Sequence, residues 1–181
     1  MRIAVLTALA GVSLAACGQD ATPPNNVAAV ETNSVETTEN VATPAAAPAT
    51  KEEALKIMHE RHEGMEDIGK ATKAIKRSLD SSSPDIAAIQ KSAATIAELA
   101  AKSPNWFPQG TGPDVGKTEA KAEIWQNYPD FAAKDRDFLK AEQALNATAA
   151  SGNLDAIKAG FADLGKSCKA CHDKYRAEEK H

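Results

Sequence analysis

The sequence predicts an all-α protein that folds as an antiparallel four-helix bundle, and three observations lead to this prediction. Alanine is abundant, whereas valine and isoleucine are sparse after the first fifty residues, which favours helices over sheets. Apolar residues recur at steps of three and four in four separate stretches, as they do along one face of a helix. Two short links and one longer crossover join these stretches, which is connectivity typical of such a bundle.

The first 49 residues are predicted to lie outside the bundle. Residues 1–16 have a basic start, an apolar stretch too short to span a membrane and a small-residue end, as a secretory signal peptide does. The segment Leu14–Cys17 is similar to the lipobox of bacterial lipoproteins, in which the thiol of the cysteine receives a lipid. The alternative is ordinary cleavage that leaves Cys17 as a spare thiol. Residues 17–49 are rich in Pro, Ala, Thr, Asn and Glu and form a predicted disordered tether, so the folded domain spans residues 50–181.

The first two helices of this domain follow from capping signals and apolar spacing. Thr50 and Glu53 form a capping-box pattern, and the serines at 81–83 end the first helix. Ser83 is then expected to cap the second helix, with Pro84 at its first position. The inward positions predicted for the first helix are Leu55, Met58, His62, Met65, Ile68, Thr72, Ile75 and Leu79. Those predicted for the second helix are Ile86, Ile89, Ala93, Ile96 and Leu99.

Two further helices follow a crossover at residues 103–116 that is rich in proline and glycine. The third helical region is predicted to begin around Thr118 and to be interrupted or restarted at Pro129. The segment Ser151-Gly152-Asn153 should end it and cap the fourth helix. One side of the fourth helix carries Leu154, Ile157, Phe161, Leu164, Cys168, Cys171 and Tyr175.

The fourth helix contains a Cys-x-x-Cys-His motif, made by Cys168, Cys171 and His172. Positions i, i+3 and i+4 share one face of a helix, so the two thiols and the imidazole point the same way. This motif is the attachment signature of c-type haem. Two thiols add to the two vinyl groups of one porphyrin, and the imidazole then lies beneath the iron. Export of the chain agrees with this, because c-type haem is attached outside the bacterial cytoplasm.

Three other interpretations of the cysteine pair are open at this point. A zinc site would need two more ligands, and only His172 and His181 lie nearby in the sequence. A thioredoxin-like redox pair is expected in a strand–helix setting, which this chain lacks. A structural disulfide between positions i and i+3 of a helix has an awkward geometry. We therefore predict one covalently attached haem c.

Three stretches of the chain resemble the cytochrome c′ family, the class II c-type cytochromes. They are "AGFADLGKSCKACHDKYR" near the C-terminus, "RHEGMEDIGKATKAI" from Arg61 and "AKAEIWQNYPDF" from Ala120. The resemblance covers roughly residues 51–180 and does not extend to the signal peptide and tether. It implies a four-helix bundle with a covalently bound haem near the C-terminal helix.

The resemblance also implies roles for individual residues. Cys168 and Cys171 would form the thioether bonds, and His172 would be the proximal ligand of the iron. Arg61 matches an arginine near a haem propionate, and Arg176 matches a basic residue against the proximal haem face. Each of these two arginines has an alternative interpretation as a solvated surface charge.

Directly after Arg61 the chain departs from the family's pattern. His62 stands where the family often has glutamine, and we expect it to face inward, at the haem edge or as a core or rim histidine. Thr118, beside Lys117, falls where members of the family contact the haem edge. Met65 matches the position that faces the open side of the iron. A methionine there binds the iron in low-spin members and only covers it in five-coordinate, high-spin members; we expect ligation by Met65.

These expectations describe a c-type cytochrome that faces the periplasm and carries single electrons, not an enzyme. The expected partners are redox proteins, a membrane reached through a lipid on Cys17 and, by resemblance, a second copy of the chain. Gly18 after the lipidated cysteine favours the outer membrane. A net charge of −4 gives no strongly basic surface for nucleic acid. The alternative function is a five-coordinate cytochrome c′ that binds nitric oxide or carbon monoxide, and a third is a zinc- or disulfide-stapled lipoprotein.

Overall fold

The computed structural model describes residues 42–178 of the chain. The predicted signal peptide, Cys17, the tether up to residue 41 and His181 lie outside the described residues. Within this range the elements are α1 (Lys51–Leu79), α2 (Ile86–Ala100), a short 3-10 helix (Ser103–Asn105), α3 (Glu123–Gln126), α4 (Tyr128–Ser151) and α5 (Leu154–Tyr175). None of the described helices is long and apolar enough to cross a membrane.

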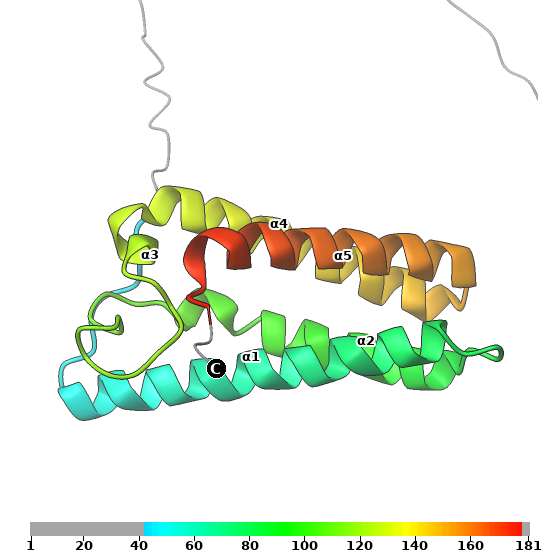
Figure 1. Ribbon diagram of the computed structural model, residues 1–181, viewed down its shortest axis with the longest axis horizontal. Coiled ribbons are helices and arrows are strands. Elements are labelled where there is room, and N and C mark those ends of the chain that lie inside the picture. Colours follow the sequence, from blue (N-terminus) through cyan, green and yellow to red (C-terminus); the bar gives the residue numbers. More distant parts are fainter. Residues whose placement is uncertain (1–41, 179–181) are drawn as a thin grey trace, which may run out of the picture. The chain divides into compact units, whose positions relative to one another are not determined.

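The four long helices form an antiparallel bundle, which confirms the predicted fold (Figure 1). α1 packs against α2, α2 against α4, and α4 against α5, whereas α1 and α5 are not among the closely packed pairs. Two hydrogen bonds fix the register of α2 on α4: Gln90 near the start of α2 donates to the carbonyl of Ala149, and Ser103, in the 3-10 helix after α2, donates to Asp135. The backbones of α1 and α5 are therefore less closely packed than those of helices that follow one another in the bundle.

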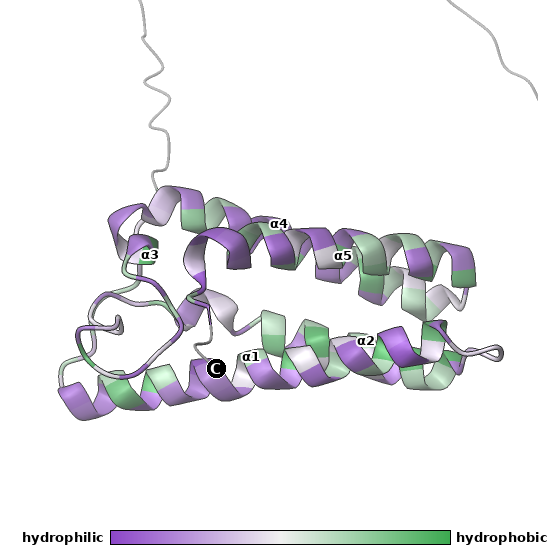
Figure 2. Ribbon diagram, in the orientation of Figure 1, coloured by the Kyte–Doolittle hydropathy of each residue, from purple (hydrophilic) through white to green (hydrophobic). Residues whose placement is uncertain are grey.

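The core lies between the apolar faces of the helices, and polar residues cover much of their outer faces (Figure 2). The turn between α4 and α5 uses Gly152 at a φ of 70°, a left-handed conformation that a side chain would strain. Asn153 then accepts a hydrogen bond from the N–H of Ala156 and caps α5, so the cap lies in the segment 151–153 that was predicted to supply it. The largest fully buried aliphatic side chains are Ile75, Ile89, Ile96, Ile124, Leu145, Ile157 and Leu164.

The inward face of α1 differs from the predicted one by about one residue. The capping box of Thr50 and Glu53 is present, so the helix begins where the sequence indicates. However, His62 and Leu55, both predicted to face inward, are exposed. The buried residues are Ala54, Met58, Arg61, Gly64, Ile68, Ala71 and Ile75. Met58, Ile68 and Ile75 are buried as predicted, and Met65 and Leu79 pack against the core. The prediction was wrong at Leu55 and His62, because small residues such as Ala54 and Gly64 face the interior instead.

α2 begins two residues later than predicted. Asp85, not Ser83, is its N-cap, and the carboxylate of Asp85 accepts a hydrogen bond from the N–H of Ala88 at 3.0 Å. The N–H of Asp85 donates to the hydroxyl of Ser78 at the end of α1, and Ser83 bonds instead within its own turn to Ser81. The turn thus binds the end of α1 to the start of α2.

Residues 118–122 are not helical, which corrects the predicted start of the third helix. This segment pairs with the end of the chain: the N–H of Lys121 donates to the carbonyl of Tyr175 at 2.9 Å, and the N–H of Ala177 donates to the carbonyl of Glu119 at 2.7 Å. The helical region then breaks at Asn127, whose φ and ψ are −133° and 53°, and α4 restarts with Pro129 in its first turn. The interruption at Pro129 is confirmed.

Candidate functional site

The Cys-x-x-Cys-His motif lies in the last two turns of α5. Cys168 and Cys171 are half-buried free thiols, and both pack against the core. Burial raises the pKa of Cys168, and burial together with the carboxylate of Asp135 raises the pKa of Cys171 to about 11. His172 is more exposed; partial burial and then the charge of Arg176 lower its pKa. The motif therefore presents two protonated thiols and a neutral imidazole at neutral pH.

The end of α5 is anchored directly behind this motif. Tyr175 is 2% exposed, and its hydroxyl donates to the carboxylate of Asp130 at 2.5 Å, while its ring packs edge-on against Phe131. Lys174 forms an ion pair with the same carboxylate at 2.9 Å, and the pKa of Asp130 is lowered by the bonds from Tyr175 and Lys174. These contacts hold the motif against the first turn of α4.

Arg61 lies inside the protein, on the face of α1 that is turned toward the crossover. Its side chain is 4% exposed. Nη1 donates to the carbonyl of Trp106 at 3.0 Å and to the hydroxyl of Thr111 at 3.3 Å. Nη2 donates to the carbonyl of Thr111 and to the hydroxyl of Thr118, both at 3.0 Å. The interpretation of Arg61 as a surface charge is thus excluded.

The charge of Arg61 is only partly compensated within residues 42–178. The acceptors of its hydrogen bonds are neutral, and the guanidinium also lies 5.0 Å from the ring centre of Phe107 and 5.8 Å from that of Trp125. Burial lowers the pKa of Arg61 to about 10, although the more distant Glu119 opposes this shift. Because a buried cation is stabilised by an anion beside it, this environment suits a ligand that carries a carboxylate.

Thr118 connects this arginine to the end of α5. Its hydroxyl accepts from Arg61 and also from the N–H of Ala120, which pairs with Arg176. The predicted site residues Arg61 and Thr118 are therefore in direct contact, and the chain from Thr118 to Ala120 joins them to the helix of the cysteines. Arg176, although exposed, lies close enough to lower the pKa of His172.

Met65 is half-buried on α1 and packs against the core. The residue before it, Gly64, lies directly against Trp106: a Cβ atom at position 64 would be 2.4 Å from the indole ring. This contact requires glycine and fixes the part of α1 that carries Met65. His62, in contrast, points away from the interior, with 51% of its side chain exposed, so the expectation of an inward-facing His62 is wrong.

Several residues around the site were not singled out from the sequence. Trp106, Phe107 and Thr111 surround Arg61 from the crossover, where the sequence indicated only turns. The sequence offers one usable signal, the pair of adjacent aromatic residues in a segment otherwise rich in proline and glycine. Glu142 is also buried, on α4, and its spacing of four from Phe138 and three from Leu145 could have identified it.

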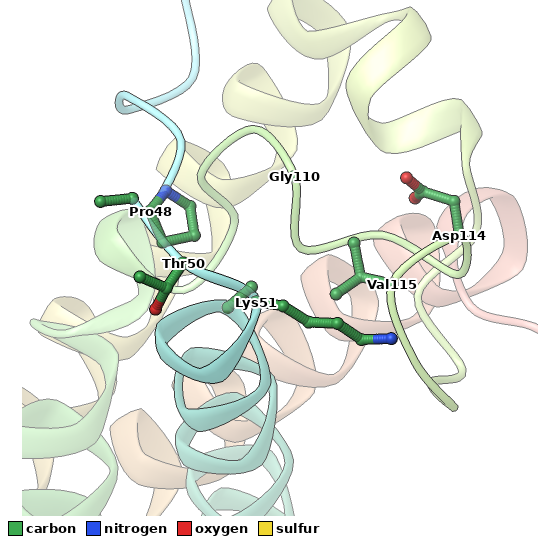
Figure 3. Close-up of a pocket in the computed structure, with 8 residues that line it drawn as sticks. Pro48, Thr50, Lys51, Gly110, Asp114 and Val115 are labelled. Carbon is green, nitrogen blue, oxygen red and sulfur yellow. The ribbon is translucent and has the colours of Figure 1, made fainter.

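A shallow pocket of about 290 Å³ lies elsewhere, where residues 48–54 meet the loop around Gly110 (Figure 3). Its lining includes Pro48, Lys51, Asp114 and Val115. The N–H of Gln109 donates to the carbonyl of Ala45 and holds the two segments together. None of the predicted haem residues lines this pocket.

The residues of the site fit a c-type haem. Two free thiols at positions i and i+3 match the two vinyl groups, and His172 follows on the same face of α5. The buried Arg61 suits the negatively charged propionate of such a group. The zinc interpretation finds no support in this donor set, because the cluster of possible metal ligands within residues 42–178 lies at His62 and not at the cysteines.

Comparison with known proteins identifies the family. The family model described as Cytochrome C′ matches residues 56–176. Among curated relatives, the cytochrome c′ of Allochromatium vinosum is 42% identical over 74 residues, which cover 40% of this chain and 48% of that protein. The aligned segment thus spans about half of the length of that relative.

Solved structures match over their full length. A cytochrome c′ described as having ligand-controlled dimer dissociation is 32% identical, with a TM-score of 0.64 over 73% of this chain and 100% of that chain. The nitric oxide complex of a cytochrome c′ variant from Alcaligenes xylosoxidans is 30% identical, with a TM-score of 0.58 over 74% of this chain and 100% of that chain. The chain therefore belongs to the cytochrome c′ family and is a haem protein with one covalently bound c-type haem.

Proposed function

We propose that this chain binds nitric oxide or carbon monoxide at a c-type haem whose iron is five-coordinate. The observation that carries the proposal is the full-length similarity to solved cytochrome c′ structures, one of which was determined as a nitric oxide complex. The haem, when bound, supplies an iron atom with one coordination position for a small ligand. The similarity favours this function over the electron carrier expected from the sequence.

The residues on α5 would hold the haem. Cys168 and Cys171 would form the two thioether bonds, and His172 would bind the iron from the proximal side. Arg176 would lie next to that side, where its charge already acts on His172. Arg61 and Thr118, which are hydrogen-bonded to each other, would face a propionate, whose charge would compensate the buried guanidinium.

Met65 would cover the open side of the iron without binding it. Its half-buried position beside the Gly64–Trp106 contact supports this role. A methionine side chain there would fill space and leave room at the iron only for small ligands. The second candidate, an electron carrier, is favoured by the same residue, because a thioether is a ligand that raises the reduction potential of haem iron. Whether the sulfur of Met65 binds the iron therefore distinguishes the two functions.

The test compares the ferric absorption spectrum and the rate of carbon monoxide binding in the wild type, Met65→Ala and Met58→Leu. We expect a high-spin wild type and faster binding in Met65→Ala, because the smaller side chain opens the site. Met58 packs near Gly116 under the crossover and serves as a control that leaves both properties unchanged. A low-spin wild type that becomes high-spin in Met65→Ala would contradict the five-coordinate proposal and establish ligation by the sulfur.

Attachment of the haem is tested independently of gas binding. We expect acidified organic solvent to leave the haem on the wild-type protein, because thioether bonds survive when the iron ligands are lost. The double variant Cys168→Ser, Cys171→Ser should yield little holoprotein, whereas Cys17→Ser should keep its haem. Extraction of haem from the wild type would contradict the roles proposed for the two cysteines.

We further propose that the protein faces the periplasm, is anchored through a lipid on Cys17 and forms a homodimer. The signal-like sequence of residues 1–16 supports the location. The dimer is supported by the relative described as having ligand-controlled dimer dissociation. Sedimentation of the purified protein with and without carbon monoxide measures its assembly, and a monomer in both conditions would contradict the dimer.

A further inference from the structure

The exposed face of α1 carries a histidine surrounded by carboxylates. The Nε2 atom of His62 lies 3.4 Å from a carboxylate oxygen of Glu66, one turn along the same helix. The ligand atoms of His62, Glu63 and Glu66 all lie within 4.8 Å of one another. On the other side of the ring, Nδ1 lies 3.8 Å from a carboxylate oxygen of Glu119, which comes from a different segment.

This donor set is chemically suited to a divalent transition metal. Imidazole nitrogens and carboxylate oxygens are both ligands of zinc in proteins, whereas calcium and magnesium prefer oxygen ligands alone. His62 and Glu66 are spaced i, i+4, so one ion can reach both side chains on the helix surface. A metal-binding histidine usually donates its second ring N–H to a carboxylate. Glu119 lies 3.8 Å from Nδ1, so a small movement of its side chain would bring it into hydrogen-bond distance.

The two segments that provide these side chains are held in place by the fold. The carbonyl of Glu119 accepts a hydrogen bond from the N–H of Ala177 at 2.7 Å, and the neighbouring Thr118 is bonded to the buried Arg61 on α1. The backbone of Glu119 is therefore tied both to the helix of His62 and to the end of α5. Little backbone ordering is needed to bring the four side chains together.

The charges near His62 also favour a cation. Glu63, Glu66 and Glu119 place three carboxylates around one imidazole, and like charges at this spacing repel one another. Lys70 lies 3.4 Å from Glu66 but only 2.8 Å from Asp67, and the buried Arg61 interacts electrostatically with Glu119. Lys70 can keep its bond to Asp67 when Glu66 turns to a metal ion.

We propose that His62, Glu63 and Glu66 bind one divalent transition-metal ion, for which Zn²⁺ is the probe, and that Glu119 orients the imidazole. This site would be open to solvent, because the side chains of His62 and Glu66 lie on the solvent side of α1, each about half exposed. It adjoins the proposed haem site, since Glu119 follows Thr118, which is hydrogen-bonded to Arg61. The proposed site gives a role to His62, the residue at which this chain departs from the pattern of its family.

The test titrates the haem-loaded protein with Zn²⁺ and follows the heat of binding. In this form His172 and the two thiols of α5 would already be engaged, which leaves the surface histidines. We expect one Zn²⁺ per chain in the wild type. His62→Ala and Glu66→Gln should weaken binding by about tenfold or more, and Glu119→Gln by about tenfold, as is usual for a carboxylate that orients a metal-bound histidine.

His59→Ala is the matched control, since His59 is an exposed histidine on the same helix that is not part of the cluster. It should bind Zn²⁺ as the wild type does, and an unchanged haem spectrum in all variants shows that they are folded. Anomalous diffraction from crystals with Zn²⁺ should place the ion about 2.0–2.2 Å from His62 and a carboxylate oxygen. Absence of Zn²⁺ binding, or an equal loss in His59→Ala and His62→Ala, would overturn the proposal.

Discussion

Glu142 is a carboxylate in the buried stripe of α4, between Phe138 and Leu145. It is 4% exposed, and its Oε2 atom has no hydrogen-bond partner within residues 42–178. Hydrogen bonds on either side show its position along α4: Ser103, in the 3-10 helix after α2, donates to Asp135, and Gln90 of α2 donates to the carbonyl of Ala149. Glu142 lies midway between these contacts, in the middle of the bundle. Burial raises its pKa, because the charged form loses water without gaining a partner.

The raised pKa of Glu142 predicts a pH-dependent stability. The folded state holds the proton of this group more tightly than the unfolded state, so the free energy of unfolding falls as the pH rises from the unfolded to the folded pKa. Glu142→Gln removes the titration and should raise the free energy of unfolding by about 1 kcal/mol at pH 7, with little difference at pH 4. Urea denaturation at both pH values measures this. Asp137→Asn, an exposed change on the same helix, is the control, and an equal effect of Glu142→Gln at both pH values would contradict the mechanism.

At the scale of the element, α1 carries Arg61, Met65 and the proposed zinc ligands, so its start determines the register of all three. The helix begins with a two-way cap, in which the hydroxyl of Thr50 accepts from the N–H of Glu53 at 3.1 Å. The carboxylate of Glu53 in turn accepts from the N–H groups of Thr50 and Ala49. This cap therefore satisfies donors that the first turn of a helix leaves without partners.

Loss of this cap should have a measurable cost. We expect Thr50→Ala to lower the free energy of unfolding by about 1 kcal/mol, because the N–H of Glu53 loses its acceptor. Thr95→Ala on α2 is a matched control, since its exposed hydroxyl bonds only to the carbonyl of Lys91 in its own helix. Urea denaturation compares the two variants, and an equal effect in both would show that the cap contributes nothing specific.

At the scale of the whole molecule, we expect the signal-like sequence of residues 1–16 and the lipid proposed on Cys17 to determine the location of the bundle. The described start of the chain is held to the domain through the hydrogen bond between Gln109 and Ala45, close to the first turn of α1. If Cys17 carries a diacylglyceryl group and a further acyl chain, two hydrophobic anchors would hold the protein on a membrane, whereas a single chain binds only marginally.

Mass spectrometry of the mature protein tests this anchor. We expect the N-terminal peptide to begin at Cys17 and to carry the mass of its lipid, and the protein to sediment with membranes. Cys17→Ser should release it into the soluble fraction with the haem still attached. A wild-type N-terminus without a modification, at Cys17 or elsewhere, would contradict the prediction.

The sequence by itself determined the features that depend on neighbouring residues. The four helices follow from apolar spacing, the start of α1 from its capping box, and the break before α4 from Pro129, because each signal acts within a few residues. The haem attachment motif is equally local, since its two cysteines and its histidine lie within the five consecutive residues 168–172. For the same reason the family could be recognised from three short stretches.

The tertiary structure decided which side chains face the site. Sequence spacing placed His62 inside and allowed Arg61 at the surface, and the structure reverses both. The reason is that the partners of Arg61 at positions 106, 111 and 118 lie 45 to 57 residues further along the chain, and only folding brings them to α1. The pairing of residues 119–121 with the end of α5 replaces the predicted helix in the same way. A long side chain such as arginine is buried where distant backbone carbonyls and hydroxyls satisfy its donors, and local sequence periodicity carries no information about them.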